Sequence, residues 1–573
     1  MLSLARRKAA CNDAKKGLTG MAATTVEPTK LRDNALPHQP AQRSAAPTSG
    51  YEGAVEHPWL ILLGLITAAI MQVLDTTIVN VALPQMAGNL GATNQEIGWV
   101  STGYILSNVV VLPMTGFLTA RFGRKQYLSV SILAFIIASF FCGTSHSLGE
   151  LVFWRILQGI GGAALLATSQ ATLRQVFPES QQGMVQSIFL LGIIVAPTLG
   201  PTLGGWITDN YTWAWCFFIN VPIGILSMML VIAFLHDPPG ARSTAKIDWA
   251  GIGLLAVSLS TMQYVLEEGQ QNDWFNDPLI LRLTVLSAVS LIGLLWWELS
   301  HRNSAPVVDF RVLKNRQLSA TIVLFVCLGF ALYGGTYLFP LFTQSILGFT
   351  STQTGLTLLP GGMATALSTL ICGRLLGPKS PIDMRLLIYF GIVIVVISLW
   401  DMGHMSPQSG DSDTQFALIL RGFGLGFLFA PVNQAAFASL KPTEVQQGSG
   451  LINLSRQLGG SFGIAILGTY VDNQTQAHRA DLAQIANSGN PLFEQRLHGV
   501  AASLMAHGYS ASSAMQAAYR IVDQMLMRQA MSLAYDDAFM MILIAFCCVI
   551  PSVFILQKPK KAAAPAESHA AMD

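Results

Sequence analysis

The sequence predicts an all-α polytopic membrane protein with fourteen membrane-spanning helices. Of its 573 residues, 52% are hydrophobic and only 11% are charged, too few charges to cover the water-facing surface of a soluble protein of this size. Apolar runs of about 20 residues, the length that crosses roughly 30 Å of hydrocarbon, recur from Trp59 onward. Because lipid offers the backbone no hydrogen-bond partner, we expect each run to be a helix.

The expected spans follow one another through short connections, with one exception. Their approximate ranges are 59–83, 98–120, 126–143, 151–175, 184–208, 214–235, 249–267, 279–298, 318–341, 354–376, 384–400, 414–437, 447–471 and 538–556. The exception is the segment 472–537, which is too polar to lie in lipid and is expected outside the membrane.

This outer segment is predicted to contain helices at 501–506 and 513–527. The second carries an apolar stripe at three- and four-residue spacing, formed by Met515, Ala518, Ile521, Val522 and Met525. Such a stripe needs a partner surface, either the outer rim of the same protein or another protein.

Lysine and arginine residues indicate the orientation of the chain. The two tails and six loops on one side carry 25 of them, whereas the six short loops on the other side carry none. Because positive charge is retained on the cytoplasmic side, both termini are expected there, in a cell inner (plasma) membrane. The polar tail 1–58 lacks the apolar stretch of a signal peptide and is expected to be disordered, and 557–573 forms a second cytoplasmic tail.

A weak internal repeat links the fourth and twelfth spans. The stretch 157–162, LQGIGG, returns at 420–426 as LRGFGLG. Two six-helix halves separated by two extra helices would place corresponding spans eight apart. We therefore predict an N-terminal half at 59–235, two additional helices at 249–298 and a C-terminal half at 318–556.

A basic turn joins spans two and three, with the sequence GFLTARFGRK at 116–125. Its glycines permit close helix approach and a tight reversal, and its cations suit helix C-termini or acidic side chains, although simple retention of positive charge is an alternative. The pattern resembles the signature loop of the major facilitator superfamily, which implies the major facilitator fold and a conformational latch at this turn. The latch residues would be Gly116, Arg121, Gly123, Arg124 and Lys125. Ala120 replaces the acidic residue that is frequent in the family, so an ion pair within the loop is not expected.

Three further motifs resemble those of drug:proton antiporters with fourteen spans. They are LDTTIVNVALP at 74–84, RILQGIGGA at 155–163 and GIIVAPTLGPTLGG at 192–205. The last resembles the span-five motif of antiporters rather than symporters, and its key positions are Gly192, Pro197, Gly200, Pro201, Gly204 and Gly205.

Sequences in the second half narrow the resemblance to the EmrB branch of the EmrB/QacA group. They are WEL at 297–299, PVVDF at 306–310 and LSRQLGGSFG at 454–463. The resemblance covers roughly 55–556. Membership of that branch implies a pump that joins a periplasmic adaptor and an outer-membrane channel.

Ionisable residues inside spans are costly and commonly face a cavity. Asp75 lies roughly 12 Å below the outer end of span one, and Arg155 and Gln158 lie at a similar depth in span four. A pair between Asp75 and Arg155, direct or through Gln158, is geometrically allowed. We predict that these three residues couple transport to protons, and the alternative is a permanently paired structural aspartate.

Three more polar residues are candidates for a central cavity. Asn453 and Arg456 lie near the middle of span thirteen, and Arg421 lies about 10 Å into span twelve. For Arg456, substrate contact and a structural hydrogen-bonding role are both open, whereas for Arg421 a structural role is favoured.

Several classes of function are excluded or disfavoured. The sequence has no Walker lysine or HExxH motif, its cysteines lack metal-ligand spacing, and a net charge of +2 does not suggest nucleic-acid binding. We therefore predict a proton-coupled antiporter that exports small amphipathic or hydrophobic compounds, is driven by the proton gradient and needs no metal or other cofactor. A proton-coupled nutrient or metabolite symporter is the nearest alternative, ahead of a membrane enzyme or a non-transporting receptor.

Overall fold

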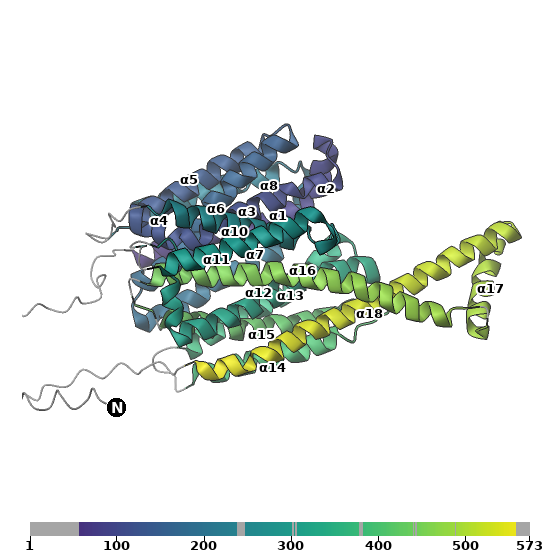
Figure 1. Cartoon of the computed structure of the whole chain (residues 1–573). Helices are drawn as coiled ribbons and strands as arrows, with labels where there is room; N and C mark the ends of the chain where they lie inside the picture. Colours follow the sequence, from purple (N-terminus) through teal and green to yellow (C-terminus); the bar gives the residue numbers. More distant parts are fainter. Residues whose placement is uncertain are drawn as a thin grey trace, which may run out of the picture. The chain divides into compact units, whose positions relative to one another are not determined.

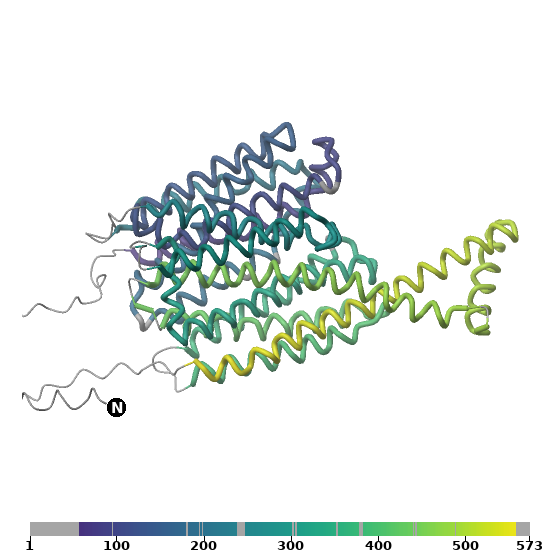
Figure 2. Tube along the Cα trace, viewed as in Figure 1, coloured from purple at the N-terminus to yellow at the C-terminus, as the bar shows by residue number. Residues whose placement is uncertain are grey.

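The structure, a computed structural model, is built from helices that lie side by side (Figures 1 and 2). It describes residues 57–237, 247–300, 303, 306–376, 382–438, 440–441, 444–487 and 489–556, and no strand occurs among them. The two predicted tails lie outside these ranges, apart from the last two residues of 1–58.

The first predicted half contains six principal helices, two of them interrupted. They are α1 (Pro58–Leu90), α3 (Trp99–Val111) continued by η1 (Leu112–Met114) and α4 (Thr115–Phe122), α5 (Arg124–Gly143), α6 (Leu148–Val176), α7 (Glu179–Asn210) and α8 (Trp215–Phe218) continued by α9 (Asn220–Phe234); a short α2 (Asn94–Ile97) precedes α3. Pro113 lies in the interruption between α3 and α4, and α7 bends by 42° around Pro197. Pro113, and in α7 both Pro197 and Pro201, remove a backbone donor from the helix, which accounts for these breaks.

The remaining helices comprise a linker pair and the second predicted half. The linker pair is α10 (Trp249–Glu268) and α11 (Pro278–Leu299), with η2 (Trp274–Asn276) between them. The second half contains η3 (Phe310–Lys314), α12 (Arg316–Phe342), η4 (Thr343–Leu347), α13 (Ser351–Leu375), α14 (Met384–Met402), α15 (Asp411–Ala438), α16 (Val445–Ile485), α17 (Pro491–Ala506) and α18 (Ala511–Ile555). Side chains cap the N-termini of several helices. Asn315 accepts hydrogen bonds from two backbone N–H groups at the start of α12, and Thr350 and Gln353 form a capping box on α13.

Every predicted span falls on a helix, but the count of spans depends on α16. Within the described residues twelve helices are long and apolar enough to cross a membrane, or thirteen when the two arms of bent α7 are taken as one span. Helix α16 does not meet that criterion. Residues such as Gln446, Asn453 and Arg456 lower its hydropathy, yet it packs against α12, α18 and α6.

Helix packing in the two halves follows the same pattern. In the first half α1 packs on α7, α9 and α6, while α5 packs on α6 and α9, and α3 packs on α6. In the second half α12 packs on α16, α18 and α15, while α14 packs on α15 and α18, and α13 packs on α15. Each helix of one set therefore has a counterpart with corresponding neighbours, as expected for a duplicated transporter.

The glycines of the sequence repeat occupy equivalent contacts. Gly159 of α6 packs on the Tyr104 carbonyl of α3, and Gly422 of α15 packs on the Gly361 carbonyl of α13. Gly161 and Gly424, two residues later, face α5 and α14, where an added Cβ would lie 2.9 Å from a backbone atom. A larger side chain at any of these positions would push the helices apart, so the repeat records helix contacts.

Polar side chains join the two halves at one end of the bundle. We call this end, where the turn at 121–125 lies, the basic end, and the opposite end, beyond which α17 lies, the hairpin end (Figure 1). Gln170 of α6 donates to Asn433 of α15 at 2.5 Å and accepts from Asn453 of α16 at 2.9 Å. Nearby, Gln446 donates to Thr168 at 3.1 Å. We call these contacts, together with the bond from Ser449 to the Ala167 carbonyl at 2.8 Å, the inter-half polar cluster.

The predicted outer segment is mostly helical rather than a loop. Helices α16 and α18 continue past the ends of the other helices and carry α17 at their tips (Figure 1). The predicted stretches 501–506 and 513–527 lie in α17 and α18. From the predicted stripe, Ala518 is buried in a small cluster with Leu497 and Ala501 of α17, so part of the stripe packs within this hairpin.

Candidate functional site

A network of polar side chains surrounds Asp75, which lies fully buried in the middle of α1. Its Oδ2 forms an ion pair with Nη1 of Arg155 on α6 at 2.5 Å. Its Oδ1 accepts from Gln158 at 3.0 Å and from Asn220 of α9 at 2.8 Å. The carboxylate thus receives three donors from two other helices, which offsets the cost of burying its charge.

Arg155 is as completely enclosed as its partner, with 1% of its surface exposed. Its Nε donates to the Val100 carbonyl at the start of α3 at 2.9 Å, and Nη1 also donates to Gln158 Oε1 at 2.7 Å. The guanidinium lies over the ring of Tyr104 at 4.3 Å from its centroid, a cation–π contact. Arg155 therefore ties α6 to α1 and α3 simultaneously.

The structure brings together the three residues that the sequence selects for proton coupling and adds others. Asn220 and Ser139 were not identified from the sequence; Ser139 accepts from Gln158 Nε2 at 2.7 Å. Asn220 is a polar residue in the apolar run 214–235, and this is the signal that singles it out. Ser139 offers no comparable signal, because isolated serines are common in membrane helices.

The basic turn is a tight reversal with close helix packing, as its glycines predict. Gly123 separates α4 from α5 with φ of 87°, a conformation that favours glycine. The Lys125 amide, at the start of α5, donates to Asp237 Oδ1 at 3.1 Å, so a carboxylate from outside the turn contacts it. Gly116 lies against α16, where an added Cβ would be 3.0 Å from Gln447 Cα. The turn thus adjoins a contact between the halves.

The span-five motif lies on α7 between α1 and α13. Gly192, Gly200 and Gly204 all face α1; an added Cβ at Gly192 would be 3.0 Å from Ile70, and one at Gly204 2.8 Å from the Ile78 carbonyl. Gly205 has open space beside it, so it does not share this packing role. Pro197 and Pro201 lie inside the helix, and the bend falls at Pro197.

The cavity candidates differ in their surroundings. Arg421 donates through Nη2 to the backbone carbonyls of Ala331 and Leu332 on α12, at 3.2 and 3.3 Å, as a structural residue would. Arg456 donates through Nη2 to Asn453 Oδ1 at 3.0 Å. Neither arginine forms an ion pair with any carboxylate in the part of the chain that the structure describes.

Comparison with known proteins places this architecture in a family. The Major Facilitator Superfamily profile matches residues 65–464. The chain belongs to the major facilitator superfamily. It also belongs to the EmrB-type multidrug transporters of that superfamily: it is 34% identical to the multidrug export protein EmrB of Escherichia coli K12 over 434 residues, covering 75% of this chain and 84% of EmrB.

Two further comparisons extend this assignment. The fatty acid resistance protein FarB of Neisseria gonorrhoeae is 32% identical over 503 residues, 87% of this chain and 96% of FarB. The crystal structure of the human organic anion transporter MFSD10 (TETRAN) aligns with a TM-score of 0.51 at 13% identity, covering 85% of this chain and 98% of that one. At this identity the structural match supports the fold alone. The protein is therefore a multi-pass membrane transporter of the superfamily.

Proposed function

We propose that this chain is a proton-coupled antiporter that exports small amphipathic compounds, and that Asp75 carries the proton. The Asp75 network is the observation that carries the proposal. A carboxylate buried among apolar helices and held by one arginine changes its interactions completely when it takes up a proton, because the ion pair then disappears.

The contacts of Arg155 indicate how protonation would move helices. In the ionised state Asp75 holds Arg155, which in turn binds the Val100 carbonyl and stacks on Tyr104. Protonation frees the guanidinium and weakens the link between α1 and α6, whereas deprotonation restores it. Such a change in one half would shift the equilibrium between the inward-facing and outward-facing arrangements of the two halves. Alternation between these arrangements is the basis of alternating access.

Export of hydrophobic and amphipathic compounds is supported by the names of the relatives. EmrB of Escherichia coli is a multidrug export protein, and FarB of Neisseria gonorrhoeae is a fatty acid resistance protein. The proposed energy source is the proton gradient alone, without a cofactor.

The proposed orientation puts the basic end in the cytoplasm of an inner (plasma) membrane and the hairpin outside it. The distribution of 25 lysine and arginine residues to one side supports it. Cysteine introduced at position 125 should react with a membrane-impermeant reagent only after the cells are opened. Labelling in intact cells would reverse the proposed orientation.

The central test is Asp75→Asn in everted membrane vesicles. The amide keeps the shape of the carboxylate but cannot release a proton, so proton-driven uptake of substrate should fall to background while the protein still inserts and folds. Uptake with unchanged pH dependence would remove Asp75 from coupling. Ser455→Ala is the matched control, because within the described ranges this hydroxyl bonds only its own helix, at the Leu451 carbonyl.

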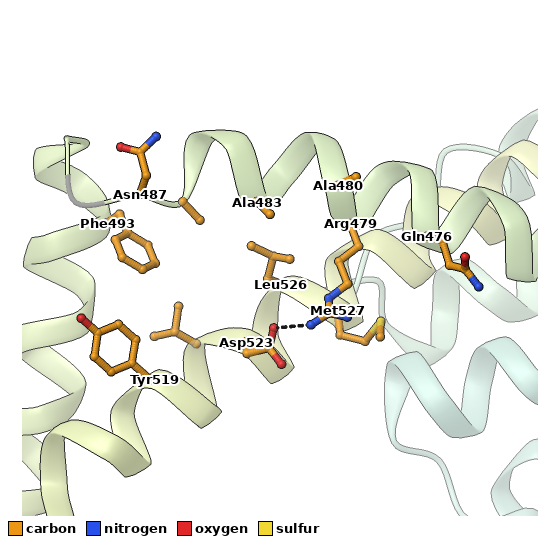
Figure 3. A pocket seen from close by; sticks show the side chains of 12 residues that line it. Gln476, Arg479, Ala480, Ala483, Asn487, Phe493, Tyr519, Asp523, Leu526 and Met527 are labelled. Atoms are coloured by element: carbon orange, nitrogen blue, oxygen red, sulfur yellow. Dashed lines mark hydrogen bonds and ion pairs between the residues drawn. The ribbon is translucent and has the colours of Figure 1, made fainter.

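We further propose that the hairpin binds a helix of a periplasmic adaptor, which would lead to an outer-membrane channel. Between the diverging arms of α16 and α18 lies a groove of about 950 Å³ (Figure 3). Its walls combine apolar side chains with the exposed ion pair between Arg479 and Asp523 at 2.9 Å. A groove that combines small and apolar residues with an ion pair and the amides of Gln476 and Asn487 suits an amphipathic helix.

Two variants test this partner. Ala483→Trp fills the groove and should abolish co-purification of a coexpressed adaptor and lower resistance in cells, while transport in vesicles is unchanged. Ile485→Trp places the same bulk on an exposed position of α16 that does not line the groove, and should have no effect. Retention of the adaptor by Ala483→Trp would exclude the groove as the docking site.

A further inference from the structure

Arg456 is buried with few hydrogen-bond acceptors. Only 7% of its surface is exposed, and among the described residues its one side-chain hydrogen-bond partner is the neutral amide oxygen of Asn453 at 3.0 Å. The buried Nε has no acceptor in the described part of the chain. A guanidinium offers five N–H donors and a full positive charge, so this environment leaves most of its binding capacity unused.

Arg456 lies at the depth where transporters built from two repeats bind their substrates. It lies eleven residues after the start of α16, about 16 Å along the helix from the basic end and so near the middle of a 30 Å hydrocarbon layer. It occupies the same face of α16 as Ser449 and Asn453, which bind α6 of the other half. Transporters built from two repeats bind their substrates at this depth, between the repeats.

The surrounding charge favours an anion. The one carboxylate at comparable depth in the N-terminal half, Asp75, is already paired with Arg155. Arg421 and Arg456 have only neutral oxygen acceptors among the described residues, so the C-terminal half has an excess of buried positive charge. Burying a cation without a counterion is costly, and a ligand that supplies the counterion recovers part of that cost.

We propose that Arg456 binds the anionic head group of amphipathic substrates, a carboxylate or a group of similar charge and geometry. The planar guanidinium matches a carboxylate by two parallel hydrogen bonds, and Nε is one of the donors that such a pair uses. The apolar part of the ligand then lies among the surrounding helices. This inference names the substrate class and rests on the proposed export function.

Binding of dodecanoate tests the proposal, with methyl dodecanoate as its uncharged counterpart. Full-length protein in nanodiscs of zwitterionic lipid should bind the carboxylate more tightly than the ester. Arg456→Gln should weaken dodecanoate binding about tenfold or more and leave ester binding unchanged. Arg456→Lys keeps the charge without the two-pronged geometry and should give an intermediate affinity, while Ser455→Ala should bind as the wild type does.

Equal loss of both ligands in Arg456→Gln, or no loss of dodecanoate, would overturn the proposal. The source of the anion is distinguished by adding phosphatidylglycerol to the nanodiscs. If this lipid displaces dodecanoate only when Arg456 is present, the site takes a lipid head group and the substrate assignment fails.

Transport separates this inference from the export proposal. Vesicle uptake of the uncharged ester that persists in Arg456→Gln, together with loss of dodecanoate uptake, supports both. If dodecanoate binding depends on Arg456 but the wild type shows no proton-driven uptake, the anion site is supported and the export proposal is rejected. Uptake of dodecanoate at the wild-type rate in Arg456→Gln rejects the anion site alone.

Discussion

In the N-terminal half a buried carboxylate and a buried guanidinium satisfy each other, whereas in the C-terminal half two buried guanidinium groups have only neutral acceptors among the described residues. Asp75 and Arg155 form an ion pair at 2.5 Å, and Gln158 and Asn220 donate further hydrogen bonds to the carboxylate. Arg421 relies on backbone carbonyls and Arg456 on one amide.

This difference arises within a repeated scaffold. Helices α6 and α15 are counterparts and share equivalent glycine contacts, yet the position of Gln158 in one half is that of Arg421 in the other. Duplication preserves the positions at which helices must approach closely, while side chains that line polar sites are free to diverge. The two halves can therefore share a fold while we propose different tasks for them, proton exchange in one and ligand binding in the other.

The largest effect on stability is expected from Arg155→Gln. It leaves the Asp75 carboxylate buried without its counterion, and breaking a buried pair in this way costs about 3–5 kcal/mol. Unfolding of the detergent-solubilised protein should report that loss. The double variant Asp75→Asn with Arg155→Gln removes both charges and should recover most of it; if the double variant is as unstable as the single one, the pair is not the cause.

A smaller effect is expected from Asn220→Ala. Asn220 donates one of three interactions to Asp75, and loss of a hydrogen bond to a charged group costs about 1.5–3 kcal/mol. In vesicles the pH dependence of efflux should shift, because the ionised form of Asp75 loses a donor while its ion pair remains. Ser139→Ala is the control, since Ser139 contacts Gln158 rather than the carboxylate; an equal shift there would assign the effect to general packing.

The smallest of the three stability effects is expected from Arg421→Gln. Removing this residue gives up hydrogen bonds to two backbone carbonyls but also removes a buried charge, so the net change should stay within about 1.5 kcal/mol. The same unfolding measurement applies. A loss as large as that of Arg155→Gln would mean that Arg421 has a charged partner and would erase the contrast between the halves.

The membrane class, the order of the helices and the residues worth testing could all be predicted from the amino-acid sequence. A long apolar run in lipid is expected to be a helix, because the helix satisfies its own backbone hydrogen bonds. A lone Asp75 in such a run is conspicuous because burying a charge in lipid is costly. The repeat of LQGIGG at 157–162 as LRGFGLG at 420–426 likewise predicted the two halves. Local pattern and elementary energetics are enough for these conclusions.

Only the tertiary structure decided which polar residues share a site and how the outer segment is built. Asn220 is 145 positions from Asp75, and Gln170 is 263 positions from Asn433, and no periodicity links such distant residues. The helices at 501–506 and 513–527 were predictable in the segment 472–537, but not that α16 and α18 extend into it from the membrane spans and carry α17 between them. Contacts between distant helices depend on how whole faces pack together, and that information lies in the combination of all the helices rather than in any one of them.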